Sequence, residues 1–325
     1  MAEVLAFTWV VIIGFCILMY ILLDGFDLGI GILFPLFSKQ DDKNIMVSTV
    51  LPVWDGNQTW LVLGGASLYG AFPQAFSLLL PALYLPIFMM VMALLLRGIT
   101  FEFRLKAKTS LRFWDTLFFV SSTVATLSQG LMLGTFVKGF VLNPDGISLT
   151  YDLFTPFNIS CAIALLFGYA LLGATWIIAK TVGNLQKKMF KIAKICLIAV
   201  TGFLMVISLW SPFIDESIKQ IWFNPHYIYK LALLPFATGL LILYFFISLE
   251  KKREYVLFGS AIGIFVCAYI GFGISTFPYL VPHFMTFRQA AAPPSSLLFM
   301  LFGALLLLPV LIAYTSYSYY IIRGC

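Results

Sequence analysis

Four charged residues interrupt long apolar stretches, and their side chains are the ones most able to do chemistry. They are Asp24, Asp27, Asp55 and Arg97. A charge at the depth of a lipid bilayer is costly unless it is paired, hydrated or neutralised. Each of the four is therefore a candidate either for moving protons or cations or for holding helices together through an ion pair.

Asp24 and Asp27 are three residues apart and share a helix face, and Arg97 supplies a counter-charge to one of them. We expect a buried pair between Asp27 and Arg97 that mainly fixes helix packing, because a permanent guanidinium keeps its partner ionised and makes it a poor proton shuttle. The alternative is a proton or cation path that uses these aspartates and is entered from the cytoplasm.

Asp55 lies in a polar run, Trp54-Asp55-Gly56-Asn57-Gln58-Thr59-Trp60. Polar residues this close together cannot face lipid, so they must face protein or water. By helix rise, Asp55 is about 8 Å from the cytoplasmic entry of its helix. We interpret Asp55, with Trp54 beside it, as part of a proton route, since burial favours reversible protonation of a carboxylate. A capping aspartate in a broken helix is the structural alternative.

The elements that position these side chains are membrane helices. Of the 325 residues, 61% are hydrophobic and only 10% are charged, a composition that no water-soluble globule can bury. The runs do not alternate as barrel strands do, so the class is an all-α polytopic membrane protein. Apolar runs long enough to cross a bilayer predict nine helices. They cover 5–36, 50–72, 76–104, 112–140, 153–180, 189–210, 225–248, 255–278 and 296–321.

The positions of the basic residues predict the orientation. They gather after the first, third, fifth, seventh and ninth helices, whereas the opposite loops hold only Lys138, Lys219, Lys230 and Arg288. This places the N-terminus outside and the C-terminus in the cytoplasm. The net charge of +6 thus reflects topology and does not indicate nucleic-acid binding.

The chain is predicted to be a single transmembrane domain, 1–325. Residues 22–29 and 165–173 are weakly similar, which suggests that helices 1–4 and 5–8 are duplicated four-helix units, with the ninth helix peripheral. On the fourth predicted helix, 112–140, a stripe of mainly small residues predicts close helix packing. It consists of Gln129, Gly130, Gly134, Lys138 and Gly139.

Few residues could hold a cofactor. The only histidines, His226 and His283, lie in short outer loops beside prolines, so we do not expect this chain to ligate haem. The five cysteines are scattered singly, and no metal site or nucleotide-binding motif is present in the sequence. An ATPase and a flavoprotein are therefore excluded.

Several segments resemble the signatures of subunit II of the cytochrome bd quinol oxidases, in order along nearly the whole chain. These are 23–31 (LDGFDLGIG), 53–61 (VWDGNQTWL), 97–104 (RGITFEFR), 168 with 173–176 (GATW), 277–282 (FPYLVP) and 290–296 (AAAPPSS). The Trp-Asp-Gly-Asn block is highly specific. The short length and the run 29–35 (GIGILFP) look more like the cyanide-insensitive branch.

The resemblance implies a partner, subunit I, that carries two haems b and haem d, oxidises ubiquinol or another quinol, and reduces oxygen to water. The resemblance also implies that the chain lies in the inner membrane of a bacterium, with its N-terminus in the periplasm. This chain would be the haem-free half, with Asp55 and Trp54 in a proton route at the interface. Asp24, Asp27 and Arg97 would form a supporting polar cluster. Some family members also bind a structural quinone on this subunit, but no motif localises one here. The compact loops leave open whether a small accessory subunit binds, and membrane lipids surround the complex.

A second function class fits the residues without the resemblance. A standalone secondary transporter also has internal repeats and buried charges. Co-purification with a haem-bearing partner separates the two, because a transporter would be complete without haem.

Overall fold

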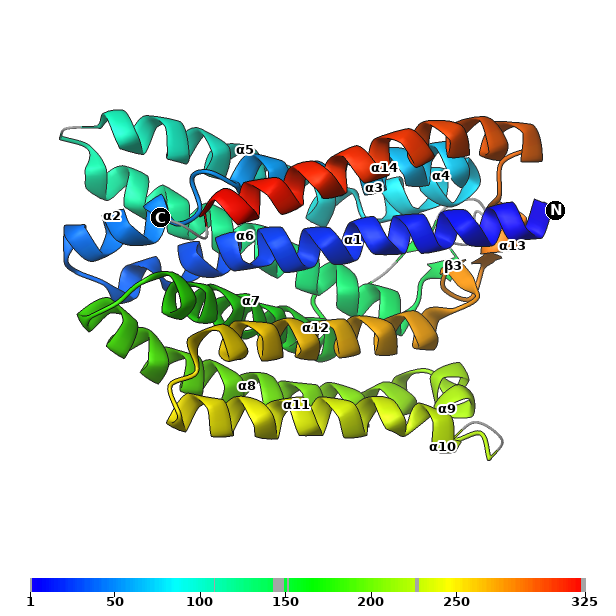
Figure 1. The fold of residues 1–325 in the computed structure, drawn as a ribbon. Coiled ribbons are helices and arrows are strands. Elements are labelled where there is room, and N and C mark those ends of the chain that lie inside the picture. The colour runs from blue at the N-terminus through cyan, green and yellow to red at the C-terminus, as the bar shows by residue number, and fades with distance from the viewer. Residues whose placement is uncertain (1, 108, 143–148, 151, 226–227, 323–325) are drawn as a thin grey trace.

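The chain folds into an elongated bundle of helices that run along its length in alternating directions (Figure 1). The structure, a computed structural model, describes residues 2–107, 109–142, 149–150, 152–225 and 228–322. The helices are α1 (Ala2–Leu33), a 3-10 turn η1 (Phe34–Leu36), α2 (Gln40–Ser48), α3 (Trp54–Ala71), α4 (Pro73–Ala82), α5 (Tyr84–Lys106), α6 (Leu111–Lys138), α7 (Pro156–Lys180), α8 (Asn184–Ile214), α9 (Glu216–Trp222), α10 (Ile228–Leu231), α11 (Leu233–Glu250), α12 (Glu254–Thr276), α13 (Phe287–Ala290) and α14 (Pro294–Ile322). The predicted all-α class is confirmed.

Two small antiparallel hairpins complete the described elements. β1 (Val141–Leu142) pairs with β2 (Leu149–Thr150), and β3 (Tyr279–Val281) pairs with β4 (Met285–Thr286). Both connect long helices, and Val281 of β3 is buried in a hydrophobic cluster with residues of α1, α4 and α14.

Eight of the described helices are long and apolar enough to cross a membrane. The second predicted helix, 50–72, corresponds to α3. α3 is not among the eight because its first two turns carry polar residues. The predicted helix 76–104 is two helices, α4 and α5, that meet at Leu83. Proline favours such a break because it lacks the backbone N–H that a continuous helix needs. The count of nine crossings stays a prediction.

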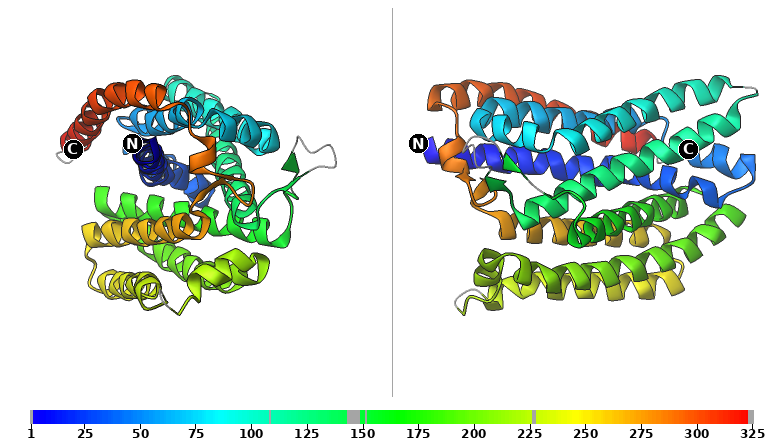
Figure 2. Two further views of the ribbon diagram at one scale, coloured as in Figure 1. Left: turned by 90° about the vertical axis from the view of Figure 1, so that its right-hand side faces the viewer. Right: turned by 180° about the vertical axis from the view of Figure 1, so that it is seen from behind.

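α1 lies in the middle of the bundle and contacts α3, α6, α7 and α14 (Figure 2). α7 packs on α1, α6, α8 and α12, and α11 pairs with α12. α8 and α11 form the outermost layer on one side, and α5 and α14 lie on the opposite side (Figure 2). α1 begins and α14 ends at opposite ends of the bundle (Figure 1). The site residues on α1 are therefore enclosed by helices from both halves of the chain.

Glycines set the closest helix crossing. Gly29 of α1 lies backbone to backbone against Gly173 of α7, and a Cβ atom on Gly29 would overlap the carbonyl oxygen of Tyr169. The two weakly similar segments, 22–29 and 165–173, thus cross each other. The stripe on α6 packs in the same way, because Gly130 and Gly134 lie against α7, and this confirms the predicted close packing.

We expect Gly29→Ala to destabilise the fold by about 1–3 kcal/mol, because the added methyl group must push two helix backbones apart. Gly202→Ala is the matched control. Gly202 lies within α8 with nothing near its missing side chain, so alanine there should leave stability unchanged or raise it slightly. Thermal unfolding of the two purified variants, each against the parent, measures the difference. Equal stability of the two variants would contradict the close crossing.

His283 lies between β3 and β4 and contacts Asp215, which directly precedes α9, at the end of the bundle where α1 begins. Its Nε2 atom lies 2.9 Å from Oδ2 of Asp215, which caps α9 by accepting a hydrogen bond from the Ser217 backbone. Burial raises the pKa of Asp215, but hydrogen bonds from Ser217 and His283 outweigh this and leave the pKa below its ordinary value. The other histidine, His226, lies outside the described residues.

Candidate functional site

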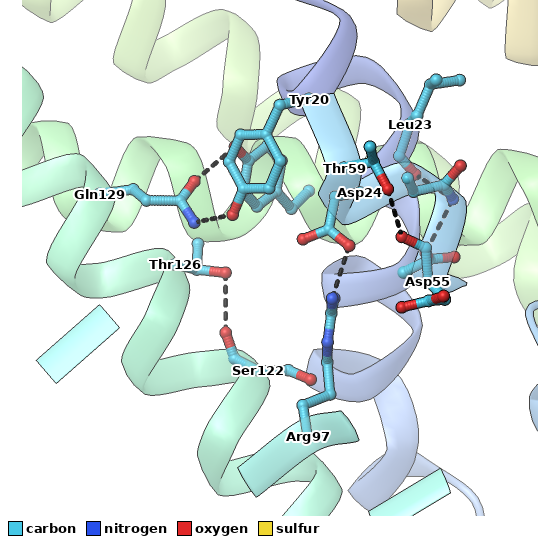
Figure 3. A network of polar contacts seen from close by, with 12 residues as sticks. Tyr20, Leu23, Asp24, Asp55, Thr59, Arg97, Ser122, Thr126 and Gln129 are labelled. Carbon is cyan, nitrogen blue, oxygen red and sulfur yellow. Dashed lines mark hydrogen bonds and ion pairs between the residues drawn. The ribbon is translucent and has the colours of Figure 1, made fainter. Parts of the chain in front are cut away.

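The centre of the site is a buried ion pair between α5 and α1. Nη2 of Arg97 donates a hydrogen bond to Oδ1 of Asp24 at 2.5 Å, and both side chains are fully buried (Figure 3). The predicted pairing of Arg97 with Asp27 is therefore wrong. The two aspartates share one broad face of α1, so their spacing could not decide between them. The direction from which α5 approaches does decide.

Asp27 is held by α3 and α14 instead. Nδ2 of Asn57 donates to Oδ2 of Asp27 at 2.9 Å and lies 3.1 Å from the carbonyl oxygen of Leu23. The Tyr319 hydroxyl donates to Oδ1 of Asn57 at 3.0 Å. The sequence analysis placed Asn57 only within the polar run 54–60 that must face protein or water. Nothing in the sequence of α14 singled out Tyr319. The Asn57 amide thus links α1, α3 and α14.

A second polar chain leads from Asp24 to α6 and α7. The Tyr20 hydroxyl lies beside Asp24 and accepts a hydrogen bond from Nε2 of Gln129 at 2.8 Å (Figure 3). The Tyr169 hydroxyl donates to Oε1 of the same amide at 2.7 Å. Gln129 was predicted as part of a packing stripe, yet its amide links two buried tyrosines. A glutamine within an apolar helix was the available signal.

Several polar atoms of this site have no hydrogen-bond partner among the described residues. They are Asp24 Oδ2, Asp27 Oδ1, Arg97 Nε and Nη1, and Ser122 Oγ. Buried polar atoms are nearly always satisfied by protein or by ordered water. These atoms belong to side chains of α1, α5 and α6.

Asp55 lies on the first turn of α3 and is exposed, whereas Asn57 is buried. The role of Asp55 in a proton route at a subunit interface stays a prediction. Two residues correspond to about 200° around a helix, so Asn57 faces α1 while Asp55 faces away from the bundle. Trp54 beside it is half-buried against Phe101 of α5, with ring centroids 5.3 Å apart.

A second charged cluster joins α2, α5 and α6. Asp115 accepts hydrogen bonds from Nε of Arg104 at 2.8 Å and from Nζ of Lys43 at 3.0 Å. Nη2 of Arg104 also donates to Oδ1 of Asn44 at 3.0 Å. In the sequence analysis, Arg104 and Lys43 were only two of the basic residues near helix ends that predict the orientation. An acidic residue following a basic stretch, Asp115, was the signal that could have revealed their pairing.

Within the part of the chain that the structure describes, no three His, Cys, Asp or Glu side chains are grouped so that they could hold a metal ion. The geometry around α1 is that of buried charge compensation, in which Arg97 pairs with Asp24 and Asn57 bonds Asp27.

Comparison with known proteins assigns this arrangement to a family. The sequence model of the family described as cytochrome bd terminal oxidase subunit II matches residues 5–322. The chain belongs to this family. Its membership decides between the two function classes that the residues left open, in favour of the oxidase subunit over the transporter.

Relatives of this subunit II chain match over nearly its whole length. Cytochrome bd-I ubiquinol oxidase subunit 2 of Escherichia coli (strain K12) is 23% identical over 370 residues, covering 99% of this chain and 95% of the relative. Cytochrome bd ubiquinol oxidase subunit 2 of Bacillus subtilis (strain 168) is 24% identical over 327 residues, covering 97% and 95%.

A solved structure shares the fold. The bd oxidase from Geobacillus thermodenitrificans contains a chain that superposes with a TM-score of 0.81 at 17% identity, covering 98% of both chains. Together with eight apolar helices, these findings make the chain a multi-pass inner-membrane subunit of a terminal oxidase, an oxidoreductase.

Proposed function

We propose that this chain is the haem-free subunit of a quinol:oxygen oxidoreductase. It stabilises a subunit I that carries two haems b and haem d, and it contributes a cytoplasmic proton route for the reduction of oxygen to water. The relatives named as ubiquinol oxidase subunits support a quinol substrate. Asp55 and Trp54 stand at the start of the route, and Asp24, Asp27 and Arg97 form the polar cluster behind them.

The observation that carries the proposal is an exposed carboxylate at membrane depth. Asn57, two residues after Asp55, bonds Asp27, which lies nine residues before the end of the first span at Leu36. By helix rise this is about 13 Å inside the span. Lipid does not tolerate a carboxylate there, so Asp55 faces protein or water, and we propose that the partner subunit covers it. The partner surface is thus the face of the bundle that carries α3.

A small cavity borders the amide that bonds Asp27. A cavity of about 10 Å³, enough for roughly one water molecule, lies between α3 and α14. It is lined by Val53, Gly56, Asn57, Tyr314, Thr315, Ser318 and Tyr319. Asn57 borders this cavity and bonds Asp27, so the cavity offers a polar connection between α14, α3 and α1, and we propose that the proton route uses it.

The proposed topology has nine crossings, with α3 as the additional one, a periplasmic N-terminus and a cytoplasmic C-terminus. The placement of the basic residues and the opposite ends at which α1 begins and α14 ends support it (Figure 1). We further propose that α1–α6 and α7–α12 descend from one duplicated four-helix unit, with α14 peripheral. The paired glycines at the crossing of α1 and α7 support this.

Co-purification tests the proposed function. With an affinity tag on this chain, a haem-bearing partner should elute with it from native membranes and give pyridine haemochrome bands of haems b and d. Membranes that lack the chain should lose these haems, although the chain ligates none. A chain that elutes alone and without haem, or a full set of haems retained in its absence, would overturn the proposal.

A further inference from the structure

The first turns of α8 carry an exposed basic face. Lys187, Lys191 and Lys194 are four and three residues apart, so their side chains project from one side of the helix. All three are exposed, whereas the buried side of α8, which packs on α7, is apolar. α8 itself contains no acidic residue. The three lysines therefore form one strip of positive charge, the lysine face.

The lysine face is not neutralised by the protein. Within the part of the chain that the structure describes, none of its three side chains makes an ion pair or a side-chain hydrogen bond. Lys188, directly beside Lys187 in the chain, differs in this respect, because its Nζ atom lies 3.4 Å from Oδ2 of Asp42. Like charges one helical turn apart repel each other, so an anion bound to the face would relieve this repulsion.

The same side of α8 faces lipid further along the helix. Ile198, Met205 and Leu209 continue the row of the lysine face at helical spacing, with exposed fractions of 55%, 58% and 72%. α8 belongs to the outermost layer of the bundle, on the side opposite α5 and α14 (Figure 2). An exposed apolar row on a spanning helix contacts the lipid chains. The lysine face therefore points toward the same lipids.

The length of α8 places the lysine face at the level of the lipid headgroups. α8 has 31 residues and is about 46 Å long, which exceeds a hydrocarbon core of about 30 Å. The stretch 195–214 alone covers about 30 Å. Its far end carries the exposed aromatic residues Trp210 and Phe213, which are typical of the opposite membrane interface. Lys194 thus lies where the core ends, and Lys187 lies about 10 Å further out.

The turn after α11 extends the positive surface. Lys251, Lys252 and Arg253 are exposed in this turn. α11 lies beside α8 in the outer layer and ends at the end of the bundle where α8 begins (Figure 1). Clustered basic residues beside a spanning helix attract anionic lipids.

We propose that the lysine face binds the headgroups of anionic phospholipids, with phosphate groups at Lys191 and Lys194 and acyl chains along Ile198 and Met205. An acidic protein would match the charges but not the apolar row that continues them, whereas an anionic phospholipid matches both. The proposal rests on the orientation given under the proposed function, which makes this end of α8 cytoplasmic.

Quenching by brominated lipids tests the site. A bimane fluorophore is attached to Ile198→Cys in the purified complex, in a background without other reactive cysteines, and the complex is placed in phosphatidylcholine nanodiscs. We expect brominated phosphatidylglycerol to quench the fluorophore at least threefold more effectively, mole for mole, than brominated phosphatidylcholine. Lys191→Gln combined with Lys194→Gln should abolish this preference, as should high salt, because both remove the attraction between the lysines and the phosphate.

Two controls are matched to this measurement. Lys106→Gln combined with Arg112→Gln removes the same number of exposed charges from the ends of α5 and α6, and should leave the preference unchanged. The fluorophore at Leu209→Cys, near the other end of the same row, should report no change when Lys191 and Lys194 are replaced.

Four results would overturn the proposal. They are equal quenching by the two lipids in the parent, a preference that survives the loss of Lys191 and Lys194, equal losses in the two double variants, and a fluorophore at residue 198 that neither lipid reaches. The last result would show that a protein covers the lysine face. Each complex is first shown to contain its haem-bearing partner, so failure of the proposed function is seen before any brominated lipid is added.

Discussion

Replacing Asp55 with asparagine is expected to slow quinol-driven oxygen uptake by the purified complex at least tenfold, while the haem content stays at the parent level. The amide keeps the size and the hydrogen-bonding capacity of the carboxylate but cannot titrate. A tenfold loss corresponds to about 1.4 kcal/mol in the activation barrier. Oxygen consumption at matched haem content, measured with an electrode, gives the result.

Two further variants make the Asp55 result specific. Asp55→Glu retains a titratable group and should keep part of the activity. Thr59→Val alters an exposed residue one helical turn further along α3, whose hydroxyl donates only to the carbonyl oxygen of residue 55, and should leave the rate within twofold. Normal turnover in Asp55→Asn would mean that protons take another route.

Removing the Arg97 charge is expected to destabilise the complex by about 3–5 kcal/mol, because Asp24 would remain as a fully buried, uncompensated carboxylate. The combination of Asp24→Asn with Arg97→Leu should be markedly milder than Arg97→Leu alone, since the two residues are in direct contact. The midpoint of thermal haem loss, together with the yield of haem-bearing complex, measures both effects.

Asp27→Asn combined with Arg97→Leu is the matched control for this pairing. Asp27 is bonded to Asn57 rather than to Arg97, so its neutralisation should not rescue the loss of the guanidinium. Rescue through Asp27 but not through Asp24 would show that the pairing of α1 with α5 differs from the one described.

The sequence alone determined that most of this chain lies in lipid and which charged residues are candidates for function. Composition and the length of the apolar runs established a helical membrane bundle, because only long apolar segments satisfy their backbone groups in lipid. Charges within those runs marked Asp24, Asp27, Asp55 and Arg97 as special, since each is costly at that depth. The motif around Trp54 and Asp55 indicated the family, which the comparisons confirmed.

Only the tertiary structure decided which of these residues meet. Helical spacing places Asp24 and Asp27 on one broad face, and the approach directions of α5 and α3 assign Arg97 to the first and Asn57 to the second. Tyr319 is 262 residues from Asn57 in the chain, so no local pattern could join them. The outward orientation of Asp55 could not be predicted either. Helix geometry gives the angle between Asp55 and Asn57 but not the side on which the neighbouring helices lie.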